Sequence, residues 1–131
     1  DPEALSVLLD IAEHETNTWV QSAAIQALAG FSDVRVTELF ERLLDHPDSW
    51  IMTLSAVHLA RRQYRGKDLF DCVLKRFMRP EEIRRGVMAW GLIEIGTQKD
   101  IARLREVMQS TDDSYLQKML TEVQKQLSWK K

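Results

Sequence analysis

The sequence predicts an all-α protein built from four helix-turn-helix units. Apolar residues recur at spacings of three and four along the whole chain, which is the period of an amphipathic helix. One apolar pattern also returns four times, at spacings of 31, 33 and 32 residues, which indicates a repeat architecture. Five glycines and three prolines are few for 131 residues, and no stretch alternates with period two, so strands are not expected.

The repeat is clearest where each predicted second helix begins. Trp19, Trp50, Ile83 and Tyr115 form this starting column. Three later columns are apolar as well: Val20, Ile51 and Leu116; then Ala23, Leu54, Val87 and Met119; then Leu28, Leu59 and Leu92. We expect these columns to face the core. We also expect the two tryptophans of the starting column to pack across the turn as structural aromatics.

An amphipathic stretch also precedes each second helix. Leu8, Leu39, Cys72 and Leu104 lie eleven residues before the starting column, so the first helices keep the same register. His46-Pro47 and Arg79-Pro80 end two of these stretches, because the residue before a proline is driven out of helical backbone. The predicted units are 1–33, 34–66, 67–98 and 99–131, within one domain, 1–131. The chain starts DPEA without an initiator methionine, so we expect it to be part of a longer protein.

The charged residues are distributed unevenly, although the net charge is only −2. Residues 1–49 carry ten acids and two bases, whereas residues 50–85 carry nine bases and four acids. No apolar run approaches the ~18 residues of a membrane-spanning helix, so we expect no membrane partner. The single cysteine, Cys72, rules out an internal disulfide and suits a reducing compartment, from which we expect a cytoplasmic location.

No motif for catalysis or metal binding stands out. The chain has no glycine-rich phosphate loop, no Cys-His metal spacing and no nucleophile elbow. Its three histidines, His14, His46 and His58, are too scattered to predict a metal site. We therefore expect a protein that is not an enzyme, with no cofactor and no metal.

The stretch from Val20 to Asp33, VQSAAIQALAGFSD, resembles the second helix of HEAT repeats of the short bacterial, phycobilisome-lyase-like type. The matching residues are Val20, Ala23, Ala24, Ala27, Leu28 and Asp33, and GLIEIGT at 91–97 repeats the end of the pattern. The resemblance implies a right-handed α-α superhelix (solenoid) of about four HEAT-like hairpins. It also implies a concave groove, lined by the second helices, that binds proteins or, less often, nucleic acid. The small alanines favour a close approach of neighbouring helices.

A non-catalytic scaffold that binds another protein in this groove is the function that we expect. If the apolar columns face the core, the positions between them line the groove. The predicted contact surface consists of Met52, Val57, Arg61, Arg85, Ala89, Trp90 and Ile93. Trp90 is the expected apolar anchor, and the arginines are expected to pair with carboxylates of an acidic partner segment. The open alternative for Trp90 is burial against the fourth unit.

Nucleic-acid binding is the alternative function, because the segment 61–85 is rich in bases. Its candidate phosphate contacts are Arg61, Arg62, Arg65, Lys67, Arg84 and Arg85. Charged side chains on a helix are often simply solvated, and the acidic first segment would repel phosphate. A protein partner therefore remains the first expectation.

Overall fold

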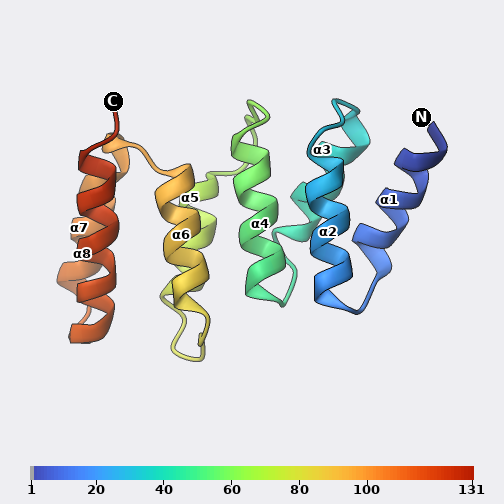
Figure 1. The fold of residues 1–131 in the computed structure, drawn as a ribbon. Coiled ribbons are helices and arrows are strands. Elements are labelled where there is room, and N and C mark those ends of the chain that lie inside the picture. Colours follow the sequence, from blue (N-terminus) through green and yellow to red (C-terminus); the bar gives the residue numbers. More distant parts are fainter. Residues whose placement is uncertain (1) are drawn as a thin grey trace. The chain divides into compact units, whose positions relative to one another are not determined.

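The computed structural model describes residues 2–131, which form eight α-helices and one 3₁₀ helix and contain no strand. The predicted all-α fold of four helical hairpins is confirmed (Figure 1). The helices are α1 (Pro2–His14), α2 (Thr18–Leu28), α3 (Val34–Leu43), α4 (Ser49–Ala60), α5 (Leu69–Phe77), α6 (Arg85–Ile95), η1 (Gln98–Asp100), α7 (Ile101–Ser110) and α8 (Ser114–Ser128). They group into two compact units, one ending at Lys67 and the other spanning Asp68–Lys131.

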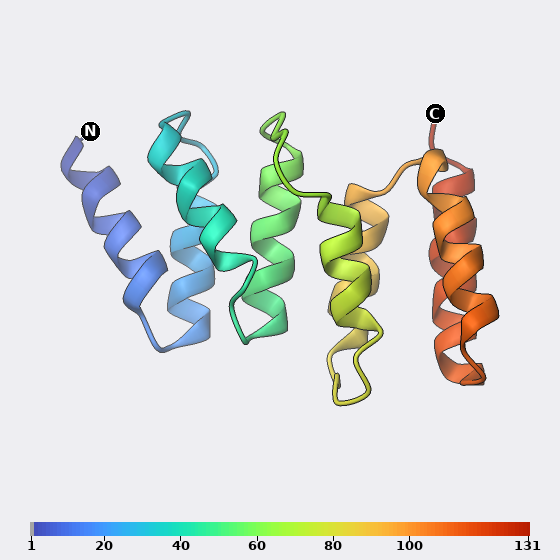
Figure 2. The ribbon, with the colours of Figure 1, turned by 180° about the vertical axis from the view of Figure 1, so that it is seen from behind.

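The first unit contains the hairpins α1–α2 and α3–α4. Within it the second helices, α2 and α4, lie side by side, while the first helices, α1 and α3, pack against each other behind them (Figures 1 and 2). Fully buried apolar side chains from all four helices fill its core; they include Ala12, Ile25, Leu28, Val36, Phe40, Ile51 and Leu59. The layering follows from helices that each bury one apolar face against a neighbouring helix.

The second unit consists of the hairpins α5–α6 and α7–α8, and its second helices also pack against each other. Helix α6 packs against α8, and η1 leads into α7 and also contacts α8. The core of this unit is formed by Val73, Phe77, Met88, Leu92, Leu104, Leu120 and Leu127. Gly96, which ends α6, lies so close to this core that a Cβ atom there would meet the Leu92 carbonyl oxygen at 2.7 Å.

Short polar side chains determine where most helices begin. Asn17 accepts hydrogen bonds from the backbone N–H groups of Trp19 and Val20, and Asp113 serves α8 in the same way. Such N-caps satisfy donors that have no partner within the helix. Helix α6 lacks a side-chain cap and begins at Arg85. The prediction that Ile83 starts this helix is therefore wrong, because Ile83 precedes it.

The prediction that the apolar columns of the second helices face the core is only partly confirmed. Leu28, Leu59 and Leu92 are fully buried, as expected. The expected packing of the starting column is wrong for Trp19, which is 83% exposed. Val20 and Ala23, which were expected to face the core, are exposed too. Because α2 packs on α1 and also on α4, it buries more than one side, and its apolar residues do not single out one core face.

Two glutamines that share one repeat position close their hairpins by hydrogen bonds. The side-chain amide of Gln21 donates to the Ala12 carbonyl at 2.8 Å, and the amide of Gln117 donates to the carbonyls of Met108 and Thr111. Each therefore binds the C-terminal end of the preceding first helix, where backbone carbonyls lack helical partners. This role explains why Gln21 is buried despite its polarity.

Cations cap the second helices in a similar way. The guanidinium of Arg62, at the end of α4, donates to the carbonyls of Ala29 and Asp33 beyond α2 at 3.4 and 3.3 Å. In the second unit, Lys130 donates to the carbonyls of Ile93 and Gly96 at the end of α6. Positive charge at a helix C-terminus is also favoured by the helix dipole. In each unit the later hairpin thus holds the end of the earlier second helix.

Replacing Gly96 with alanine should destabilise the protein by about 1–3 kcal/mol, because the new Cβ would press on the Leu92 carbonyl and on Phe70 and Leu127. Gly86→Ala is the matched control. A Cβ at Gly86 meets nothing within 4 Å, so this change should be neutral or stabilising by up to ~1 kcal/mol through helix propensity. Urea unfolding measures both. Equal effects of the two substitutions would contradict the packing described at Gly96.

Arg62→Met should lower the free energy of unfolding by about 1–3 kcal/mol, because half-buried carbonyls of the first unit lose their donor. Arg65→Met, three residues away, removes the same charge from an exposed side chain with no hydrogen bond or ion pair to any described residue, and should change stability little. The comparison is made by urea unfolding followed by circular dichroism. A loss of stability as large in the Arg65 variant would show that charge, not capping, is responsible.

Candidate protein-binding surfaces

Helix α6 carries four of the seven predicted contact residues. Trp90 is 36% exposed in the middle of this helix, and Ala89 and Ile93 beside it are half-buried. Gly86 and Glu94, one turn before and one turn after Trp90, are exposed and lie on the same side of the helix. The side of α6 that contains Trp90 therefore offers an apolar ring between small and charged neighbours.

Arg85, the fourth of these residues, is engaged in the hairpin. Its Nε donates to the Phe77 carbonyl at 2.8 Å and its Nη2 donates to the Arg79 carbonyl at 2.6 Å, both at the end of α5. The guanidinium also lies 5.8 Å from the centre of the Phe77 ring. Arg85 occupies the same repeat position as Gln21 and Gln117, so it closes its hairpin and retains only part of its donors for a partner.

The three predicted contact residues of the first unit are placed differently from one another. Met52 and Val57 are each 1% exposed on α4, so they contribute to the core and offer no accessible side chain. Nine of the twelve residues of α4 are buried, including polar ones, which is why the helix has no polar face that reveals its orientation. Arg61 is exposed directly after the last turn of α4.

The six bases proposed for nucleic acid divide between the two units. Arg61, Arg65 and Lys67 are exposed in the segment that follows α4, whereas Arg62 in the same segment is held by Thr37 and by backbone carbonyls. In the second unit, Arg84 is exposed and Arg85 binds the end of α5. Arg62 and Arg85 are thus structural in these positions, which reduces the positive charge that is open to phosphate.

The sequence reasoning missed a set of exposed apolar residues at the turns within the hairpins. Ile83 is 91% exposed and Tyr115 is 62% exposed, while Trp50 is half-buried. With Trp19 they form the starting column of the second helices. A helical side chain tilts toward the helix N-terminus, so a large residue in the first turn extends past the end of the helix toward the solvent. The tilt accounts for the exposure of Trp19 and Tyr115 in their first turns, whereas Ile83 is exposed because it precedes α6.

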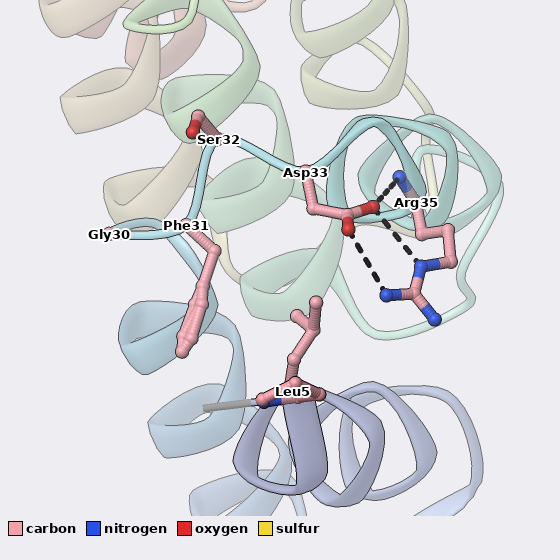
Figure 3. A pocket seen from close by; sticks show the side chains of 7 residues that line it. Leu5, Gly30, Phe31, Ser32, Asp33 and Arg35 are labelled. Atoms are coloured by element: carbon pink, nitrogen blue, oxygen red, sulfur yellow. Dashed lines mark hydrogen bonds and ion pairs between the residues drawn. The ribbon is translucent and has the colours of Figure 1, made fainter.

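Figure 3 shows a shallow pocket of about 550 Å³ in the first unit, between the start of α1 and the loop from α2 to α3. Leu5 and Phe31 supply its apolar wall. Asp33 accepts bonds from the backbone N–H, Nε and Nη2 of Arg35, and these bonds hold the pKa of the carboxyl below its usual range. The charged pair is therefore satisfied within the protein and serves as the N-cap of α3.

Helix α4 contains buried polar atoms that have no hydrogen-bond partner among the described residues. They are Thr53 Oγ1, Ser55 Oγ and His58 Nε2. Burial lowers the pKa of His58, and the nearby charges of Arg61 and Arg62 lower it further, so the imidazole is neutral at pH 7. The centre of its ring lies 6.0 Å from that of Phe40 on α3, so His58 is part of the packing between these helices.

Residues 2–131 contain neither a candidate metal site nor a candidate membrane span. In this part of the chain, no three side chains of His, Cys, Asp or Glu gather closely enough to hold a metal ion together. None of the helices described there has the length and apolar character that a bilayer crossing requires.

Comparison with known proteins bears on the first two hairpins. Residues 1–61 match the family model described as HEAT repeats. No curated protein and no solved structure matches the chain. The matched segment includes Val20–Asp33 and both second helices of the first unit, α2 and α4, which pack against each other. Residues 1–61 are therefore similar to HEAT repeats in sequence, and all four hairpins have the helical repeat fold of that class.

Proposed function

We propose that this protein is a non-catalytic interaction module that binds another protein through its second helices. HEAT repeats commonly serve as protein-interaction scaffolds, and the first two hairpins match that family. The observation that carries the proposal is Trp90, a large aromatic side chain that remains 36% exposed in the middle of a helix. Tryptophan and arginine are the residues that most often dominate the energy of protein interfaces.

The proposed contact surface is the side of α6 that contains Trp90. Ala89 and Ile93 supply apolar surface beside the indole, and exposed Gly86 lets a partner approach the helix backbone closely. Arg61 belongs to the other unit and is a separate candidate, an exposed cation that could pair with an acidic partner segment. Arg85 contributes mainly by holding the start of α6 against the end of α5.

Two narrower parts of the proposal rest on sequence. The alanines and Leu28 in the stretch Val20–Asp33 support assignment of the repeats to the short bacterial, phycobilisome-lyase-like type. Nucleic-acid binding through Arg61, Arg65, Lys67 and Arg84 is the weaker candidate, since two other bases of that set are bound to backbone carbonyls.

A photo-crosslinking amino acid at position 86 tests the contact surface in cells. Its side chain would project one turn from Trp90 into open space. We expect a crosslink to a specific protein, and we expect Trp90→Ala to reduce it at least about tenfold through loss of a buried aromatic anchor. Mass spectrometry identifies the product and measures its yield.

The same crosslinker at Gln109, an exposed position on α7, is the positional control, and Trp129→Ala is the matched tryptophan control. Neither should reproduce the effects at positions 86 and 90. An equal crosslink from position 109, or a crosslink at 86 that persists unchanged in the Trp90 variant, would rule out this surface.

A further inference from the structure

We propose that the turns within the hairpins of the first unit form a second docking surface, which takes a basic segment of a partner protein. We define this turn surface by Glu15, Trp19 and Val20 in the first hairpin and by Asp45 and Trp50 in the second. It lies at the N-terminal ends of α2 and α4 and shares no residue with the contact surface proposed on α6.

An exposed aromatic ring is the first element of the surface. Trp19 is 83% exposed and Val20 next to it is 43% exposed, both in the first turn of α2. Helix α4 packs beside α2 and starts at the same end of the unit (Figures 1 and 2). Its first turn carries a second tryptophan, the half-buried Trp50. Two tryptophans at adjacent helix starts, one of them almost fully exposed, are costly to leave in water.

Unneutralised acids are the second element. The Glu15 carboxylate accepts only the Asn17 backbone N–H, and the side chain of Asp45 has no partner among the described residues. The sequence has no lysine or arginine before Arg35 and none between Arg42 and Arg61. Arg42 is already bound to Glu13 at 2.8 Å, so no lysine or arginine of the described turns balances the charge of Glu15 and Asp45.

These two elements together select the occupant. A lysine or arginine can lie over the exposed indole of Trp19 while the carboxylates of the two turns attract it, and an adjacent apolar residue can cover Val20. Phosphate backbones and anionic lipid surfaces are repelled by the same acids. Two copies of this surface facing each other would also bring like charges together, which disfavours a symmetric dimer through it.

The test uses a short fluorescein-labelled peptide of Lys, Arg, Leu and Gly, with a counterpart in which glutamate replaces every base. Fluorescence anisotropy should show binding of the basic peptide alone, weakening as salt increases. Trp19→Ala should reduce the affinity about fivefold, because a cation over an exposed tryptophan is stabilised by up to ~1 kcal/mol. Asp45→Lys should reduce it at least as much by reversing a local charge.

Matched controls separate this surface from the rest of the molecule. Trp129→Ala removes another exposed tryptophan and Glu38→Lys reverses another exposed acid, and both should leave the peptide affinity unchanged. Trp90→Ala should also leave the peptide affinity unchanged. The turn surface can therefore bind the peptide even if the contact surface proposed on α6 binds no partner.

Three results would overturn the proposal. One is equal binding of the acidic peptide, and another is an affinity that falls with Glu38→Lys as much as with Asp45→Lys, which would indicate only the overall charge. The third is a concentration-dependent dimer in sedimentation velocity that Trp19→Ala abolishes, which would make a second copy of this chain the occupant.

Discussion

The carbonyl groups at the ends of short helices are the constraint on which this structure depends. Each helix leaves its last carbonyls without helical partners, and a chain of eight short helices multiplies that cost. Here side chains of the following helix or hairpin supply the missing donors: Gln21 and Gln117 within hairpins, Arg62 and Lys130 between them. The capping bonds also hold neighbouring helices in register, so the repeat is stabilised by polar contacts as well as by its apolar core.

This constraint explains how much of the fold could be predicted. The helical period and the prolines after His46 and Arg79 are local signals, and they located the four hairpins. The start of α6 was misplaced because no capping residue marks it. The rotation of α2 was missed because Gln21, a polar residue expected at the surface, is buried to serve a carbonyl group that the sequence does not reveal.

Less of the candidate sites than of the fold could be predicted, because the exposure of a side chain depends on contacts between distant segments. Trp90 retains accessible surface, but Met52 and Val57 belong to a helix that is buried on most of its positions. Whether an arginine is open to a partner depends on distant carbonyl groups, as Arg62 and Arg65 illustrate from nearly adjacent positions. The periodic column of large apolar residues was a correct repeat signal, and its exposure at the hairpin turns makes it a candidate for recognition.

Helix α4 buries Met52 and Val57, which were expected to line a groove, whereas the first turn of α2 exposes Trp19. Hydroxyl-radical footprinting of the folded protein, read by mass spectrometry against the urea-unfolded chain, tests this difference directly. Trp19 should be modified almost as fast in the folded protein as in the unfolded chain, and Met52, a residue of high intrinsic reactivity, should be strongly protected. Rapid modification of Met52 together with protection of Trp19 would contradict the account and restore the opposite rotation of these helices.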